Sequence, residues 1–420
     1  MMGVCRSWND KICGLDGLFT DIAFDTSISA TISTATKFLE IAETRSNNLR
    51  IYARCIVWVG DPAQQALLSR LRLQSWRFVC FEVECTSAPF IAYFNLPAPR
   101  LLRLVHTPAL PEGLFASSFA SLRVLDASVN RHFPWPITTF SNLVALRLEN
   151  SHSVHRFCAT SLFDLIGRAH HLEELRLTEF LRFSGGSEAK PLVHPNLKYV
   201  RLIQCNLQFI LQHLLFPNAT GLRVESYNIG LAGEPDLPVT EDMGFFSPLQ
   251  VCSVPILEQH LFTKVTVHMQ DLFEDKIYFK LGLGCGKTRT IDFTVTFQKE
   301  GPWEARVRSS INGILQRIRL GARIELSLFH HLPLLPFKHP SLYRGDPPLA
   351  LIDSPLFRLP QVTILRTDYS LLQATILRLA DLEHMNLPNL KCYSFDIDTR
   401  PASVDFALPA ETVTCFDPGL

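Results

Sequence analysis

Residues 197–207 read LKYVRLIQCNL, and the spacing of the apolar residues in this stretch decides the fold. They fill every position of the pattern L-x-x-L-x-L-x-x-N/C-x-L, namely Leu197, Val200, Leu202, Cys205 and Leu207. Side chains two positions apart on a strand point to the same face, so Val200 and Leu202 should face a core. Cys205 would stand where the chain turns away. The stretch therefore predicts a short strand followed by a turn.

The same spacing recurs upstream at intervals of 21 to 29 residues, in copies that begin at Leu101, Leu122, Leu143 and Leu172. Weaker copies begin at Leu222, Leu249, Val362 and Leu390. Intervals of this size are typical of leucine-rich repeats. Helical spacing between copies, as in residues 161–170, indicates a return segment. We therefore predict an α/β leucine-rich-repeat solenoid, a curved parallel sheet with outer helices.

The regularity of the repeats predicts four regions. Residues 1–30 would form a short helical segment or cap, 31–254 the leucine-rich repeats, 255–355 degenerate repeats with insertions, and 356–420 C-terminal repeats and a cap. In the third region apolar residues alternate from Ile291 to Phe297 and from Ile324 to Leu328, which predicts strands. A separate small domain is the alternative for this region, because Pro- and Gly-containing stretches at 232–238 and 333–348 could be its boundaries.

Composition excludes several classes of function. The 420 residues contain 40 Lys and Arg against 40 Asp and Glu, so no net charge favours nucleic acid or an anionic membrane. No signal peptide and no apolar segment of about 18 residues is present, which predicts no membrane association. The 11 cysteines include no CxxC pair, which favours a reducing compartment. We expect an intracellular protein, cytoplasmic or nuclear.

Motifs for chemistry are weak, and we predict no catalytic residues, no metal and no cofactor. Residues 282–288, GLGCGKT, end like a phosphate-binding loop, but position 281 is Leu where that loop requires Gly. Alternation after the motif predicts a second strand, so we interpret it as a Gly-rich hairpin turn. Three histidine pairs lack partners at metal-ligand spacing: His152 with His155, His170 with His171, and His330 with His331.

The N-terminal residues resemble the second half of an F-box. Residues 4–8, VCRSW, are similar to its VCRxW helix, and residues 18–22, LFTDI, to its xxLWxxI helix, with Phe19 in place of Trp. Residues 35–40 and 48–52 look like the segment that leads into the repeats of F-box proteins with leucine-rich repeats. The resemblance implies adaptor-binding residues Trp8, Leu15, Leu18, Phe19 and Ile22. The family's first helix, LPxEILxxIF, would lie before Met1, so we expect a Skp-type adaptor to bind if the F-box is completed.

This resemblance implies a non-catalytic substrate receptor of an SCF-type cullin-RING ubiquitin ligase. The alternative is a free-standing leucine-rich-repeat scaffold that does not bind the adaptor, in which the N-terminal segment is a plain cap on the first repeat.

Aligning the copies predicts where a partner protein would bind. Residues between the leucines face the concave side, which places Arg147, Arg176 and Arg201 in one column and Tyr199 in the next. Arginine forks suit carboxylate and phosphate, so we predict an acidic or phosphorylated protein partner. The alternative is that neighbouring acidic residues neutralise the arginines: Glu149, Glu173 and Glu174.

Overall fold

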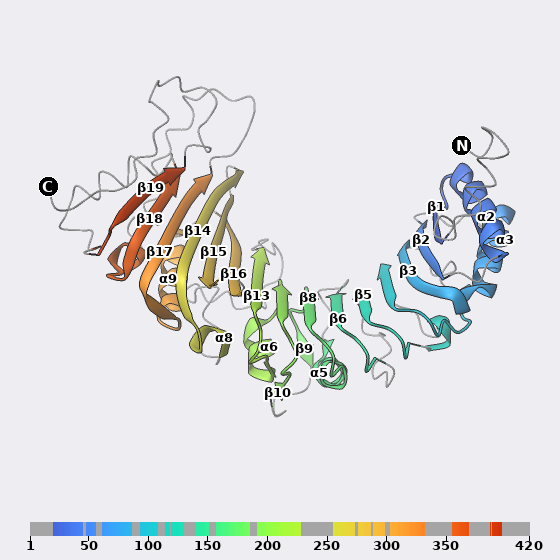
Figure 1. Ribbon diagram of the computed structural model, residues 1–420, viewed down its shortest axis with the longest axis horizontal. Helices are drawn as coiled ribbons and strands as arrows, with labels where there is room; N and C mark the ends of the chain where they lie inside the picture. Colours follow the sequence, from blue (N-terminus) through green and yellow to red (C-terminus); the bar gives the residue numbers. More distant parts are fainter. Residues whose placement is uncertain are drawn as a thin grey trace, which may run out of the picture. The chain divides into compact units, whose positions relative to one another are not determined.

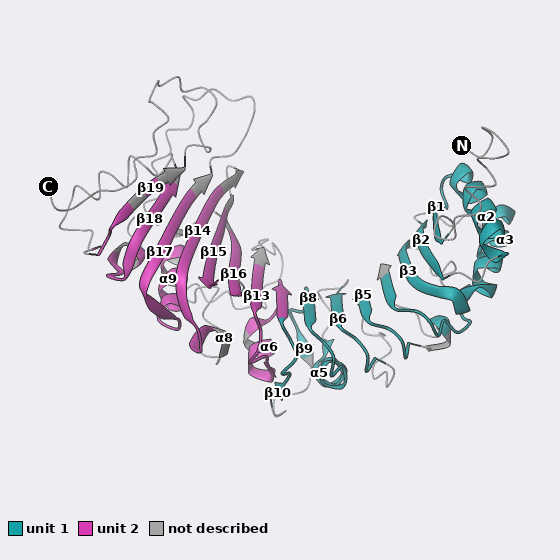
Figure 2. Ribbon diagram, in the orientation of Figure 1, with its two compact units in different colours: residues 1–198 teal, residues 199–420 magenta. Residues whose placement is uncertain are grey.

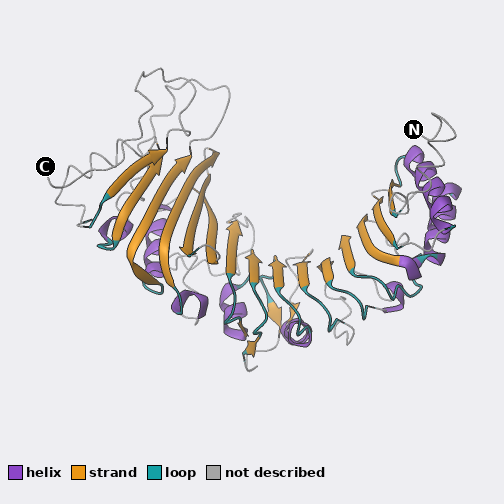
Figure 3. Ribbon diagram, in the orientation of Figure 1, coloured by secondary structure: helices purple, strands orange, loops and turns teal. Residues whose placement is uncertain are grey.

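The computed structural model divides the chain into two compact units, Met1–Lys198 and Tyr199–Leu420 (Figure 2). The structure describes residues 20–44, 48–55, 61–85, 93–107, 114–117, 119–129, 140–150, 157–184, 191–227, 255–273, 276–286, 289–298, 303–331, 355–368, 387 and 389–396. The division falls within the region 31–254 that the sequence assigns to repeats. Strands form most of the regular structure in these residues (Figure 3).

The first unit contains a parallel sheet with seven strands among its described residues. They are β1 (Asp21–Asp25), β2 (Leu49–Cys55), β3 (Phe78–Cys85), β4 (Arg103–Thr107), β5 (Val124–Val129), β6 (Ala145–Asn150) and β8 (Glu174–Thr178). Neighbours in the sheet follow chain order, and each pairing is parallel (Figure 1). The predicted LxxLxL stretches of this unit therefore do form one strand each.

Three α-helices belong to the described part of the first unit: α2 (Ser29–Glu43), α3 (Pro62–Leu73) and α5 (Ala159–Arg168). The α2 and α3 helices follow β1 and β2 and lie beside one another (Figure 1). The predicted helix near residue 161 is confirmed as α5, which buries Leu162, Leu165 and Ile166 at helical spacing. The remaining elements are short: η1 (Ser75–Arg77), η2 (Leu114–Ser117), β7 (Phe157–Cys158), β9 (Phe183–Ser184) and β10 (Leu192–Val193).

Leucines form the core of the first unit, as their spacing predicts. The first leucine of each copy is fully buried at Leu101, Leu122, Leu143, Leu172 and Leu197. In four copies this residue closes the same turn, because its N–H donates to the carbonyl three residues earlier. Aromatic rings fill the space beside β3, where Phe81 lies 4.8 Å from Phe94 and 5.0 Å from Phe115 between ring centroids.

The second unit is a mixed sheet with longer strands. Its described strands lie in the order β11 (Tyr199–Ile203), β13 (Gly221–Tyr227), β16 (Arg289–Gln298), β15 (Lys276–Cys285), β14 (Leu261–Phe273), β17 (Arg319–His331), β18 (Val362–Asp368) and β19 (Cys392–Asp396). The β14–β15 and β15–β16 pairs are antiparallel. The other elements are α6 (Leu207–His213), β12 (Leu214–Leu215), α8 (Pro255–Glu258), α9 (Trp303–Leu315) and η4 (Pro355–Arg358).

The predicted fold class is wrong. The described residues form large sheets with few helices, and the second unit is mixed, whereas a leucine-rich-repeat solenoid needs a parallel sheet covered by outer helices. Between β4 and β6 no α-helix occurs in the described residues. In the second unit, apolar residues alternate over strands of 10 to 13 residues, a pattern that favours antiparallel hairpins.

The F-box resemblance implies a helical N-terminal segment, and this prediction is wrong at Ile22, the part of it that the structure describes. Ile22 lies in β1, where it is in register with Ile51 of β2, and its side chain is fully buried. The resemblance placed this residue on a helix that contacts an adaptor. Trp8, Leu15, Leu18 and Phe19 lie outside the described residues.

Candidate partner-binding surface

One face of the first unit's sheet carries the side chains that alternate with the buried leucines, and we call it the polar face. Its strand register confirms the part of the predicted column that lies in this unit, since Arg147 and Arg176 are partners on β6 and β8, and the row continues through Asp126 on β5 to Val105 on β4. Glu174 lies in the neighbouring column, two positions before Arg176 on the same strand. Parallel strands about 4.8 Å apart hold these charges in rows.

Arg147 is neutralised by acidic residues on both neighbouring strands. Its Nε donates to Glu174 Oε1 at 2.8 Å, and its Nη2 donates to Glu174 Oε2 at 3.3 Å. Its Nη1 lies 3.6 Å from Asp126 Oδ2. The hydrogen bonds to Glu174 raise the pKa of the guanidinium above its usual value. For Arg147 the neutralisation alternative is therefore correct.

Arg176 differs from its neighbour in the column. Its side chain is half-buried on β8, and no hydrogen bond or ion pair joins it to another residue that the structure describes. Two of the predicted neutralising groups are paired with other cations: Glu173 with Lys198 at 2.7 Å, and Glu174 with Arg147 at 2.8 Å. Arg176 thus presents guanidinium donors that no described acid occupies.

The charged rows at the start of the polar face were not predicted from the sequence. Here acids and arginines alternate between strands in the pairs Asp21–Arg50, Asp25–Arg54, Arg54–Glu84 and Glu82–Arg103, at 3.7, 4.0, 3.3 and 2.6 Å. They border a groove of about 480 Å³ whose lining includes Tyr52. The signal was present in the sequences DIAFD, RIYAR and FEVE, where charges alternate with apolar residues.

In the second unit, Tyr199 and Arg201 share one face of β11. Arg201 is in register with Arg223 of β13, and the Nε atoms of both arginines contact Glu225 Oε1. Glu225 is only 2% exposed. Tyr199 is in register with Gly221 and is exposed. The sequence pattern predicts Tyr199 and Arg201 but not Arg223 and Glu225, because the copy that begins at Leu222 is incomplete.

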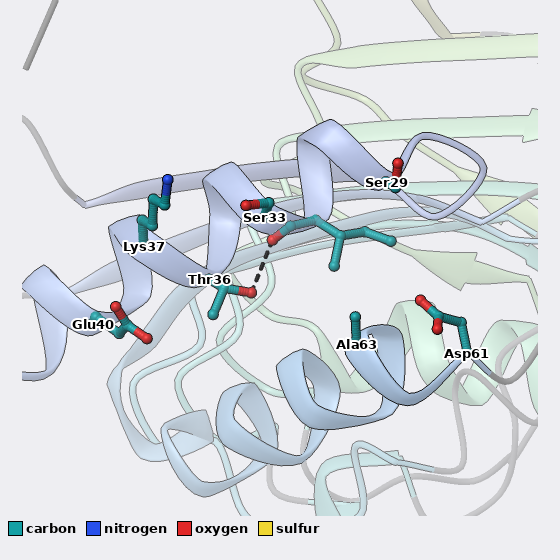
Figure 4. Close-up of a pocket in the computed structure, with 8 residues that line it drawn as sticks. Ser29, Ser33, Thr36, Lys37, Glu40, Asp61 and Ala63 are labelled. Atoms are coloured by element: carbon teal, nitrogen blue, oxygen red, sulfur yellow. Dashed lines mark hydrogen bonds between the residues drawn. The ribbon is translucent and has the colours of Figure 1, made fainter.

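A second groove, of about 350 Å³, lies between α2 and α3 (Figure 4). Ser29, Ser33 and Thr36 line it from α2, together with the exposed Lys37. The Thr36 hydroxyl donates to the Ile32 carbonyl of its own helix at 2.8 Å. That hydroxyl therefore serves the helix backbone, and the charged groups that line the groove are those of Lys37, Glu40 and Asp61.

The segment around Gly286 is a hairpin, as predicted. The β15 and β16 strands pair antiparallel up to Cys285 and Arg289, and Gly286 adopts φ +64° in the turn. The described residues that follow the Gly-rich sequence form the strand β16 and not a helix, so they offer no helix N-terminus for phosphate. Lys287 and Thr288 lie outside the described residues.

Comparisons and the remaining sites give no further identification. No family model, no curated protein and no solved structure matches the chain.

The described residues contain no group of three or more His, Cys, Asp and Glu side chains placed to hold a metal ion. His170 and His171 are exposed, whereas His152 and His155, as well as the side chains of His330 and His331, lie outside the description. In the same described part of the chain, every helix is too short or too polar to span a membrane.

Proposed function

We propose that this chain is a non-catalytic protein that binds a partner protein through the polar face of its sheet, and that the partner segment is acidic or phosphorylated. The observation that supports the proposal is the contrast between Arg147 and Arg176 in one column. Arg147 is held by two acids, whereas Arg176 has no partner among the described residues. A half-buried charge without a counterion loses part of its hydration free energy, and holding its side chain in place on a rigid strand costs conformational entropy. A bound anion would offset both costs.

The proposal is tested by affinity capture with the full chain and a double variant of the polar face, Arg147→Ala and Arg176→Ala. Proteins captured by the wild type should be lost with the variant, as measured by quantitative mass spectrometry. Treating the lysate with phosphatase separates phosphorylated partners from acidic ones.

A matched control removes two arginines that are paired with acids outside the polar face: Arg70→Ala on α3 and Arg366→Ala on β18. This control changes the charge by the same amount and should retain the captured proteins. Unchanged capture by the variant at Arg147 and Arg176 would contradict the proposal.

For the biological setting, we propose substrate recognition within an SCF-type ubiquitin ligase, in the cytoplasm or nucleus. The F-box-like residues 4–22 support it, and the free thiols of Cys55, Cys80, Cys158 and Cys205 are consistent with a reducing compartment. Co-purification with a Skp-type adaptor tests it, using this chain and a version extended with an LPxEIL-type helix. Binding by the extended version alone would support a truncated receptor, and binding by neither would contradict the receptor role.

One observation favours the alternative of a free-standing binding scaffold. Ile22 is a fully buried residue of β1 and is paired with β2, so it contributes to the sheet and not to an exposed adaptor surface. The scaffold predicts that neither version of the chain co-purifies with the adaptor while partner capture is retained.

A further inference from the structure

Arg201 and Arg223 form the least expected charge arrangement in the second unit. They lie opposite one another on adjacent parallel strands, where like charges repel. Glu225 lies beneath them, and its Oε1 accepts a hydrogen bond from Arg201 Nε at 2.8 Å and contacts Arg223 Nε. One carboxylate for two guanidinium groups leaves one positive charge in excess.

The terminal nitrogens of both arginines are available. Each guanidinium uses Nε to contact Glu225, and no hydrogen bond of its Nη atoms is found to the rest of the described chain. Arg201 and Arg223 are 36% and 45% exposed. Because Glu225 fixes the Nε side of both groups, the Nη donors are pre-organised, which reduces the entropy lost when an anion binds.

Tyr199 adds an aromatic surface beside these donors. Its Cδ1 would lie 3.0 Å from a Cβ built on Gly221, so its ring passes closely over the glycine of the neighbouring strand. Its side chain is 56% exposed. We call Tyr199, Arg201, Gly221, Arg223 and Glu225 the Arg201–Arg223 patch.

We propose that the Arg201–Arg223 patch binds a phosphate monoester on an aromatic side chain of a partner protein, with both guanidinium groups on the phosphate and Tyr199 against the ring. This inference rests on the proposed partner-binding function and names its ligand. A phosphate monoester is favoured over a carboxylate because its three terminal oxygens can accept from both arginine forks at once. The ring of Tyr199 favours an aromatic carrier.

A purely structural role for the two arginines is the competing explanation, since a buried carboxylate needs partners. That role would be fulfilled through Nε and predicts no affinity for phosphate. The test must therefore measure binding and folding separately.

Phenyl phosphate is the probe, and its binding to the purified full chain is measured by phosphorus NMR line broadening at low ionic strength. We expect Arg201→Gln and Arg223→Gln each to weaken binding about tenfold or more, as for loss of a charge-assisted contact. Tyr199→Ala should weaken phenyl phosphate binding but leave inorganic phosphate unchanged. Benzoate, followed by proton NMR, should bind more weakly than phenyl phosphate.

The matched control is Arg366→Gln. Arg366 also contacts a carboxylate through Nε, at 3.2 Å from Glu325, but its strand partners are Ser327 and Ser394 and not a second arginine. This variant should bind phenyl phosphate like the wild type, and thermal unfolding of every variant verifies folding.

Three results would overturn the inference: no binding of phenyl phosphate by the wild type, undiminished binding by a folded double variant at Arg201 and Arg223, or benzoate bound as tightly as phenyl phosphate. If one of these is found while partner capture still depends on Arg147 and Arg176, only the ligand assignment fails. If phenyl phosphate binds but no partner is captured, the proposed function fails and the patch remains an aryl phosphate site.

Discussion

Arg147 and Glu174 face one another across β6 and β8 and are joined by two hydrogen bonds, of 2.8 and 3.3 Å. Arg176 lies on the same strand as Glu174 and is the register partner of Arg147, yet it forms no such pair within the described chain. Two arginines of one predicted column therefore differ: Arg147 is ion-paired, and Arg176 has no such pair among the described residues.

The first prediction separates these roles by stability. Arg147→Ala should lower the free energy of unfolding by roughly 0.5–1 kcal/mol, because it removes a two-point ion pair that is partly exposed. Arg176→Ala should change it by less than about 0.5 kcal/mol. Urea denaturation measures both, and an equal loss for Arg176→Ala would indicate a structural contact at Arg176.

The second prediction concerns the aromatic core of the first unit. Phe81→Ala should lower the free energy of unfolding by about 3–5 kcal/mol. The Phe81 ring is fully buried between Phe94 and Phe115, and its removal would leave a cavity. Leu73→Ala is the control, since Leu73 is exposed and should contribute little. A small effect of Phe81→Ala in urea denaturation would mean that this cluster repacks freely.

The sequence predicted what depends on local spacing. The strands, their buried leucines and the column from Val105 to Arg176 all follow from a period of two within each copy and a common register between copies. The outer helices of the predicted solenoid could not be derived from this spacing. They were expected because leucine-rich repeats have them, and not because the residues between β4 and β6 have helical spacing. Spacing alone does not require those residues to be helical.

The remaining features depend on contacts between distant residues. Pairing of β13 with β16 skips two intervening strands, and no pattern within either strand specifies that choice. Side-chain torsions and burial decide which acid each arginine contacts. Arg147 contacts Glu174, and Arg201 and Arg223 both contact Glu225. The candidate site was therefore predicted as a set of columns, without knowledge of which arginines are already neutralised.

The third prediction concerns thiol reactivity. Cys158 is exposed, and hydrogen bonds from Ser161 and Thr160 lower the pKa of its thiol. Burial of Cys80 and, to a smaller extent, the negative charge of the nearby Glu82 raise the pKa of its thiol to about 12. Because the thiolate is the nucleophile, iodoacetamide at pH 8 should modify Cys158 well before Cys80. Peptide mass mapping measures the order, and protein unfolded in urea should lose the difference.

The fourth prediction is a loss of stability on acidification through His194. This side chain is 3% exposed, its Nε2–H donates to the Ala169 carbonyl at 3.0 Å, and its buried Nδ1 lacks a partner in the described residues. Burial lowers the pKa of His194. The unfolded state, with a pKa of about 6.5, therefore takes up a proton before the folded state does.

Stability associated with His194 is thus present above about pH 6.5 and is lost as the pH falls from there through the lower folded pKa. His194→Gln keeps a donor for Ala169 but does not titrate, so it should flatten urea-denaturation stability over this range. His171→Gln is the control at an exposed site. An unchanged pH profile for His194→Gln would assign the acid sensitivity to other groups.

The fifth prediction tests the hairpin interpretation of residues 282–288. Gly286 adopts φ +64°, and no atom lies within 4 Å of a Cβ built there, so Gly286→Ala is penalised only through its backbone. We expect Gly286→Ala to lower the free energy of unfolding by about 1 kcal/mol and Gly286→Asn to lower it by less, because asparagine tolerates the left-handed region better.

Since β16 follows the turn where a phosphate-binding loop would begin a helix, ATP with Mg²⁺ should leave the thermal midpoint of the wild type unchanged. A rise of the midpoint with ATP that Gly286→Ala abolishes would contradict the hairpin interpretation and restore a nucleotide site.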